Sequence, residues 1–391
     1  MGGTWHDRQA IPKLLCPLII LPKSEHMDSD QLERLWYRAI CSDHEIDRIL
    51  AVADGRDHLL KLRADALVDH VRLLRVYRAR ARRAGSDWSF EGSFDTRHFE
   101  RFLESLPPDA RNECNGVTYG NFFSNDPGGQ IQPTEYGPIV TISESIQYFL
   151  KFMHLALMDY STKVPMHVRW SALRIALRVM LQTEALDFDL DPRGIISEEI
   201  AEAISRPMAG QLQFIAGHEF AHHILGHLSE DDVSDRPSFI PVLGSDEPVG
   251  VRPVYNRSQL EELEADVQAI LLPKYAPAEQ SMVFQCALMW FNSLDIYEGV
   301  LDAVKPKGPW DIETHPCAEE RYEHLMTAIP TPKEMDLGDW DVLRATTAEF
   351  KKRLVEDVAL NIEYYEVYGS IYLDEPNTYW RGAKLIDRVD Y

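Results

Sequence analysis

Two histidines separated by three residues constrain the fold of this chain more than any other feature. They stand in the segment FIAGHEFAHHILGHL, as His218 and His222 of the pentapeptide HEFAH. The apolar residues around them predict a helix over roughly 209–228. Residues four apart on a helix lie about 40° apart around its axis, so both imidazoles leave the same face. This spacing lets one helix offer two nitrogen ligands to a tetrahedral zinc ion, with Glu219 placed to act as a general base.

A second predicted helix, some forty residues further on, offers a third ligand. Ser258 and Glu261 form a capping-box pattern that predicts the helix start. Glu262 and Asp266 follow four residues apart beside the apolar stripe, where a carboxylate pair is costly unless it is neutralised. We therefore expect Glu262 to bind the metal and Asp266 to accept the outer ring N–H of a ligating histidine. The alternative for this helix is a solvated acidic face.

Two further histidines near the motif are poor ligand candidates. His223 lies about 100° and His227 about 140° around the helix from His222. A metzincin would need a glycine three and a histidine six positions after His222, and these positions hold Leu225 and Leu228. His223 and His227 are therefore expected to support a ligand, to pack, or to lie on the surface.

Three segments together resemble a known family. HEFAHHILGH, NRSQLEELEADVQA and ETHPCAEERYEHL resemble the gluzincin metallopeptidases of the HtpX, Oma and CAAX-prenyl-protease type, with the pattern HExxH, then SRxxExxAD, then THPxxxxR. Asn256 replaces the serine, and the spacing from Arg257 to Glu262 is longer. Members are often embedded in membranes. The soluble phage-exclusion proteases of the Lit type, and other cytoplasmic stress or defence peptidases, are looser analogies.

The resemblance implies roles for individual residues. It makes Glu262 the third zinc ligand and Asp266 the support of a ligating histidine, in agreement with the helix spacing. By the same resemblance, His315 stabilises the transition state or occupies the fourth zinc position. Arg321 makes a structural ion pair or contacts the cleft. A helix-entry turn is the alternative role for the pair formed by His315 and Pro316.

The function that these residues predict is zinc-dependent hydrolysis of a peptide bond in a protein or peptide substrate. Zn²⁺ is expected on His218, His222 and Glu262, with Glu219 moving the proton of the attacking water. His315 is the first candidate to stabilise the oxyanion, and Tyr297 and Tyr322 are alternatives. The rival hypothesis is a non-catalytic regulatory or binding protein with a structural or vestigial zinc site. Constitutive and latent activity both stay open.

The composition restricts the binding partners and the cellular compartment that we expect. The formal net charge of −23 argues against binding to nucleic acid or anionic membranes. No apolar segment has the length and purity of a membrane span, so we expect a soluble, cytoplasmic protein. The odd number of cysteines without a CxxC pair favours a reducing compartment. These cysteines are Cys16, Cys41, Cys114, Cys286 and Cys317.

The predicted fold class is α+β and mostly α-helical. Residues 1–115 are expected to form an N-terminal helical region for docking or regulation. Residues 116–330 are expected to form a zincin-like catalytic domain with a small sheet. Residues 331–391 are expected to pack a helix and an aromatic tail onto it. A regulatory partner could bind at the N-terminal helices.

Within these regions, several segments carry a specific expectation. The runs 116–123 and 138–143 are rich in β-branched and aromatic residues and predict a strand pair, either an edge that binds substrate or a plain structural hairpin. Residues 229–257 are rich in Pro, Gly and Asp and predict either an active-site lid or a surface loop. Residues 56–84 predict one helix whose arginines face an anionic partner or solvent. Residues 341–368 predict one long helix.

Overall fold

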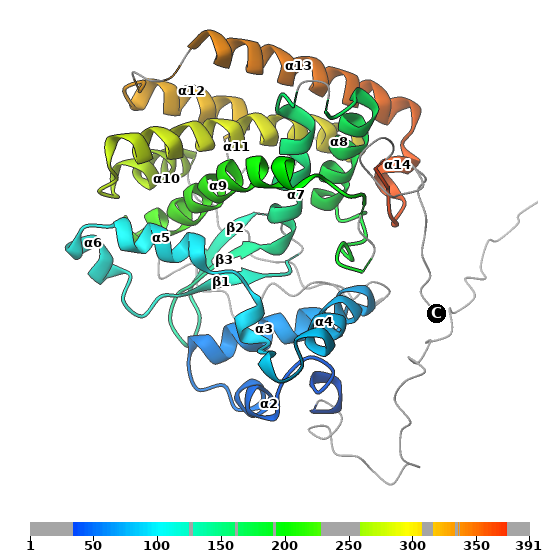
Figure 1. Ribbon diagram of the computed structural model, residues 1–391. Helices are drawn as coiled ribbons and strands as arrows, with labels where there is room; N and C mark the ends of the chain where they lie inside the picture. The colour runs from blue at the N-terminus through cyan, green and yellow to red at the C-terminus, as the bar shows by residue number, and fades with distance from the viewer. Residues whose placement is uncertain are drawn as a thin grey trace, which may run out of the picture.

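The computed structural model describes residues 34–124, 128–160, 163–190, 193–227, 259–306, 316–332, 335 and 337–373. They form a mostly helical fold with one small sheet, as the sequence predicts (Figure 1). The helices before the sheet are α2 (Asp43–Leu50), α3 (Gly55–Val68), α4 (Val71–Ala84), α5 (Arg97–Ser105) and α6 (Pro108–Glu113). Those after it are α7 (Glu144–Leu157), α8 (Met166–Met180), α9 (Glu198–Ile224), α10 (Gln259–Leu271), α11 (Pro277–Val304), α12 (Ala318–Ala328), α13 (Leu337–Leu360) and α14 (Glu363–Glu366).

The sheet has three strands in the order β1-β3-β2, namely β1 (Thr118–Phe122), β2 (Gly129–Gln132) and β3 (Ile139–Ser143). Both predicted strands exist and are neighbours, but they run parallel, so the predicted hairpin is wrong. The segment between them, which the sequence indicates to be only turns, contributes β2 antiparallel to β3. A parallel pair needs a long connection, and β2 lies within it.

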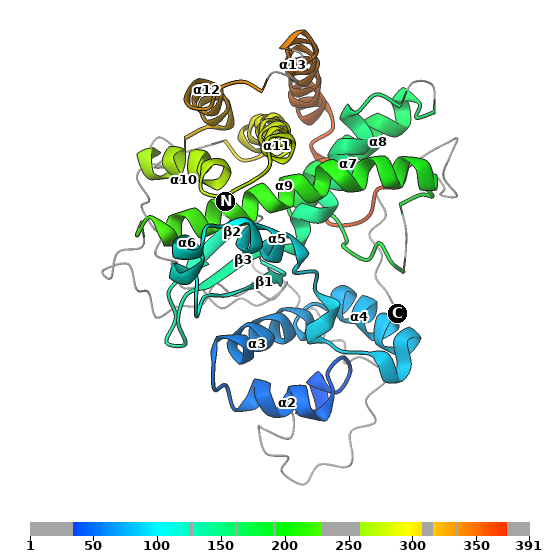
Figure 2. The ribbon, with the colours of Figure 1, turned by 60° about the vertical axis from the view of Figure 1, so that its left-hand side comes forward.

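Helices cover both faces of the sheet. Helices α2, α3 and α4 lie on one side, and α9 lies on the other with α5 and α7 (Figures 1 and 2). Two strand glycines permit this close packing. A Cβ atom at Gly120 would lie 2.2 Å from a guanidinium nitrogen of Arg63 on α3, and a Cβ at Gly129 would lie 2.8 Å from Oε1 of Glu219 on α9. The sheet is therefore held between the N-terminal helices and the helix that carries HEFAH.

The predicted helix over 56–84 is two helices, α3 and α4, which meet at Asp69 and His70. The Asp69 N–H donates to a carbonyl of α3 as that helix ends, and the His70 side chain accepts a hydrogen bond from the Leu73 N–H as α4 begins. Neither residue is a strong helix breaker, so the apolar pattern gave no sign of the break. The two helices and their neighbours bury a hydrophobic cluster of their own, drawn from residues 37–94 and Phe123. The domain boundary at 115 stays a prediction.

The helix that carries HEFAH is longer than predicted. The helix expected over 209–228 is part of α9, which begins at Glu198 and passes through Pro207. Ser197 caps its start by accepting a hydrogen bond from the Ile200 N–H. A proline inside a helix removes one hydrogen bond, but residues 210–222 are all buried and hold the remaining turns in place. Burial thus overrides the local signal to end the helix.

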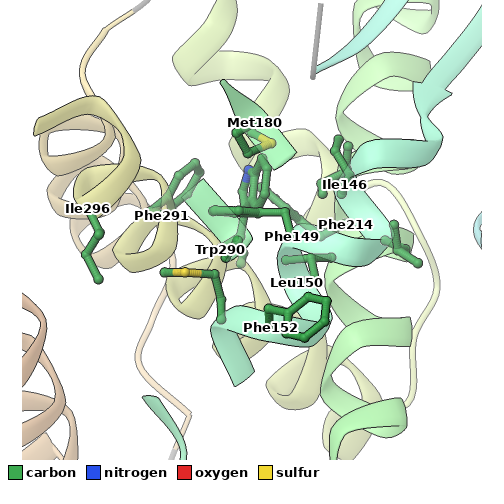
Figure 3. Packing of buried hydrophobic residues seen from close by; sticks show 14 of the residues in the cluster. Ile146, Phe149, Leu150, Phe152, Met180, Phe214, Trp290, Phe291 and Ile296 are labelled. Atoms are coloured by element: carbon green, nitrogen blue, oxygen red, sulfur yellow. The ribbon is translucent and has the colours of Figure 1, made fainter. Parts of the chain in front are cut away.

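The main core lies between α7, α8, α9 and α11. Figure 3 shows Phe149 of α7, Phe214 of α9 and Trp290 and Phe291 of α11 packed together. Helix α13 packs on the outside of α11. The predicted helix over 341–368 is therefore α13 followed by the short α14. Within the described residues, no helix is both long enough and apolar enough to cross a lipid bilayer.

A cluster of buried charges binds the segment 364–371 to this core. This C-terminal charged cluster consists of Arg178, Glu184, Asp187 and Arg193. Glu184 accepts from both arginines, at 2.8 Å from Arg178 and 3.1 Å from Arg193. The arginines also donate to carbonyls and to the Ser370 hydroxyl in the segment 364–370. No pattern in the sequence predicts this cluster.

Candidate metal centre

Three donor atoms from α9 and α10 converge on one point. Nε2 of His218 lies 3.1 Å from Nε2 of His222. Nε2 of His218 lies 3.3 Å from Oε2 of Glu262, and Nε2 of His222 lies 3.3 Å from Oε1 of Glu262. A tetrahedral zinc ion with bonds of about 2.0–2.1 Å separates its ligands by about 3.3 Å. The three side chains, called here the metal cluster, are buried and could hold a metal ion.

The sequence explains why α9 and α10 lie close enough to share a ligand set. Gly217 directly precedes His218, and a Cβ atom there would lie 2.6 Å from the ring of Phe102 and 3.4 Å from Cβ of Ala269 on α10. Figures 1 and 2 show α10 beside the C-terminal half of α9. In α10, Glu262 and Asp266 are buried on the side that faces α9. The solvated acidic face is therefore excluded for these two residues.

Asp266 supports His218 as the spacing predicts. Its Oδ1 lies 2.8 Å from Nδ1 of His218, the ring nitrogen that points away from the metal cluster. Arg321 of α12 donates two hydrogen bonds to the same carboxylate, of 2.5 and 2.7 Å. Burial alone would lower the pKa of His218, but Asp266 and Glu262 raise it to about 9 in the metal-free protein. Burial would raise the pKa of Asp266, and Arg321 with His218 holds it below its ordinary value.

Arg321 makes the structural ion pair that is one of its two predicted roles. Its guanidinium also lies over the ring of Phe291, 4.9 Å from the centroid. Glu298 of α11 sets the start of α12, because its carboxylate accepts a hydrogen bond from the Ala318 N–H. One helix end is thus anchored so that Arg321, one turn later, faces Asp266.

Glu219 is buried at the boundary between α9 and the sheet. It lies against the backbone of Gly129 in β2, where a Cβ atom would lie 2.8 Å from Oε1 of the glutamate. Any side chain at position 129 would displace the glutamate. Sequence reasoning missed β2 and Gly129. The only available signal was the pair of glycines in the segment SNDPGGQIQ, which favours turns as much as a close approach of backbone.

The other predicted residues have different outcomes. His223 is half-buried and contacts the Glu113 carbonyl of α6. His227 lies beside His222. Two predicted oxyanion donors pack elsewhere: Tyr322 lies under Arg344 of α13, and Tyr297 packs against Phe149.

Several predictions concern residues outside the part of the chain that the structure describes. They are His315 with its proposed catalytic role, Thr314, the Arg257 match, the cap at Ser258 and the segment 229–257.

No protein-family model matches the chain, and no curated protein or solved structure matches it either. The local geometry therefore carries the functional argument. His218, His222 and Glu262 form a buried cluster. Glu219, also buried, follows His218 in the sequence and lies against the edge strand β2.

Proposed function

We propose that this chain is a zinc-dependent endopeptidase with a zincin-like catalytic domain. The observation that carries the proposal is the convergence of the metal cluster: the two imidazole Nε2 atoms lie 3.1 Å apart, and each lies 3.3 Å from one of the two carboxylate oxygens of Glu262. Two imidazoles and one carboxylate are a catalytic zinc ligand set that leaves a fourth position open. Zinc fits the donors better than calcium or magnesium, which prefer oxygen ligands alone.

A zinc ion held there supplies Lewis-acid polarisation of the scissile carbonyl and lowers the pKa of the attacking water. Glu219 follows the first ligand directly, so its carboxylate stands beside the metal cluster without belonging to it. It accepts the proton of the attacking water and passes it to the leaving amine. His315 keeps its proposed role as the donor that stabilises the oxyanion.

The edge strand β2 supports an extended peptide as the substrate. The Ser143 N–H donates to the Gly128 carbonyl, so the backbone groups of Gly129 and Ile131 point away from β3. Among the described residues, no strand pairs with β2 on that side. A substrate strand that added here would run past Glu219, which touches Gly129. Cleavage within unstructured segments is the expected specificity.

The test compares zinc-loaded wild-type protein with Glu219→Gln on a library of unstructured fluorogenic peptides. We expect the variant to retain zinc and to lose about 10²–10⁴-fold in cleavage rate. Glu202→Gln, an exposed position on the same helix, is the matched control and should cleave normally. A Glu219→Gln protein that binds zinc and cleaves at the wild-type rate would overturn the proposed mechanism. Zinc binding without any cleavage by the wild type would favour the non-catalytic alternative.

A further inference from the structure

The C-terminal end of α9 has a geometry that returns the chain onto a metal ligand. The His227 N–H donates to the His222 carbonyl at 3.0 Å, and the Gly226 N–H donates to the His223 carbonyl at 3.1 Å. Gly226 has a φ of 70°, in the left-handed region. This pair of bonds is the Schellman motif, which brings the second residue after the C-cap, Leu225, next to the residue three before that cap. Here those two residues are His227 and His222.

An apolar contact usually accompanies this motif, but this chain has a contact between two imidazoles. Nδ1 of His227 lies 2.9 Å from Nδ1 of His222. Nε2 of His222 is the nitrogen in the metal cluster, so its Nδ1 is the outer nitrogen. The other nitrogen of His227, Nε2, lies 3.5 Å from Oε2 of Glu264 on α10. The side chain of His227 is only 8% exposed, so these neighbours determine its environment.

The tautomers follow from these contacts. A hydrogen bond between two ring nitrogens needs one that carries a proton and one that does not. When Nε2 of His222 binds a metal, its Nδ1 must carry the proton and donate it. Nδ1 of His227 is then the acceptor, and the His227 proton stands on Nε2, which faces Glu264. Helix α10 therefore provides the candidate ligand Glu262 and also Glu264, which is the last residue in the series of contacts that begins at His222.

We propose that His227 is a positioning residue that holds His222 in the tautomer and orientation for binding metal through Nε2. Gly226 acts with it, because its left-handed backbone folds His227 over His222. The inference rests on the metal cluster of the proposed function but not on peptidase activity. The two histidine ligands are then supported differently. His218 contacts the carboxylate of Asp266 directly, whereas His222 contacts His227, which in turn contacts Glu264.

The test measures the zinc affinity of the full chain by competition with a chromophoric chelator. His227→Leu removes the acceptor, and leucine suits the apolar position of the Schellman motif, so the helix end should fold. We expect a loss of about 10–100-fold in zinc affinity, as for other partners of metal-bound histidines. His227→Asn returns an acceptor close to the position of Nδ1 and should recover most of the affinity. His223→Leu, at the neighbouring histidine, should bind zinc like the wild type.

A second readout separates positioning from packing. Long-range ¹H–¹⁵N correlation spectra report which nitrogen of His222 carries a proton. In the zinc-free protein, at a pH where His222 is neutral, the wild type and His227→Asn should show a protonated Nδ1 on His222, and His227→Leu should show a mixture of the two tautomers. Wild-type zinc affinity and an unchanged His222 tautomer in His227→Leu would overturn the inference and leave the proposed function intact. A wild-type chain that binds no zinc would overturn both.

Discussion

The C-terminal charged cluster and the metal cluster, both in the described part of the chain, differ in how their buried charges balance. The C-terminal charged cluster contains two arginines and two carboxylates, all almost fully buried. Glu184 stands between Arg178 and Arg193, and Asp187 pairs with Arg193. Burial raises the pKa of Glu184, and the two arginines oppose that rise. Every charge there has a partner of opposite sign within the protein.

Among the residues that the structure describes, the charges around the metal cluster are mostly of one sign. Three carboxylates act on a single arginine, because Asp266, Glu262 and Glu219 all raise the pKa of Arg321 against the effect of its burial. All three carboxylates are at most 3% exposed. With His218 and His222 neutral, as metal ligands must be, this group retains two negative charges. The rise in the pKa of His218 to about 9 is the response of the metal-free protein to the same surplus.

Within the described part of the chain, the contrast separates a cluster whose charges pair with one another from one that could hold a cation. A buried charge is costly unless it is paired, so a balanced cluster is explained by the fold alone. A surplus of two negative charges matches one divalent cation in sign and size. Charge surplus and donor spacing are independent observations, and both favour a metal ion on His218, His222 and Glu262.

The largest effect should follow from removing a ligand. Glu262→Ala deletes one of three donors and half of the surplus charge. Zinc affinity should fall by more than the roughly 10–100-fold that loss of an outer partner costs, so that no binding is measurable against a chelator. Glu261→Gln, one position earlier on α10, is the control. Tight zinc binding by Glu262→Ala would place the metal elsewhere.

The next effect should fall on stability rather than on metal. Arg193→Met leaves Glu184 and Asp187 short of a partner in a buried site, which should cost about 3–5 kcal/mol of unfolding free energy. Urea unfolding measures this, with exposed Arg206→Met as a control that should unfold like the wild type. The zinc affinity of the folded Arg193→Met protein should be unchanged. A large loss of zinc affinity would show that the two clusters are coupled.

A smaller loss of metal binding is expected from Asp266→Asn. The amide still contacts His218, but it removes the negative charge that supports the imidazole and pairs with Arg321. Zinc affinity should fall about 10–100-fold, a weaker effect than for Glu262→Ala. Chelator competition on protein shown to be folded by circular dichroism is the measurement. An affinity equal to that of the wild type would mean that Asp266 belongs with the structural charges.

The ligand set was predictable from sequence because its geometry is local. The angle between His218 and His222, or between Glu262 and Asp266, depends only on helix periodicity, and the apolar stripe shows which side of each helix is buried. Arg321 was placed by resemblance alone, since only the tertiary fold brings α12 to Asp266.

The missed features depend on contacts between distant segments. Strand β2 has four residues, of which only Ile131 is buried, so no alternating pattern identifies it. Its pairing partner and its contact with Glu219 are set by the fold. The C-terminal charged cluster was missed because charged residues are expected at the surface. Only the folded chain shows that Arg178 and Glu184 are buried together.

The smallest effect concerns a buried group that belongs to neither cluster. His154 of α7 contacts Oε1 of Gln211 on α9 through Nε2, and burial lowers its pKa from 6.5 to about 4. Between these values the unfolded chain binds a proton that the folded chain does not. His154 therefore causes no loss of stability above pH 6.5, and stability falls as the pH drops from 6.5 towards 4.

In EDTA, which removes any contribution from zinc, His154→Gln should reduce the loss of unfolding free energy between pH 7 and pH 5.5 by about 1 kcal/mol. Urea unfolding at the two pH values checks this, and equal slopes for wild type and variant would show that His154 is not held neutral. An effect confined to this pH range, with zinc affinity at pH 7 unchanged, would separate a neutral buried histidine from the two histidines of the metal cluster.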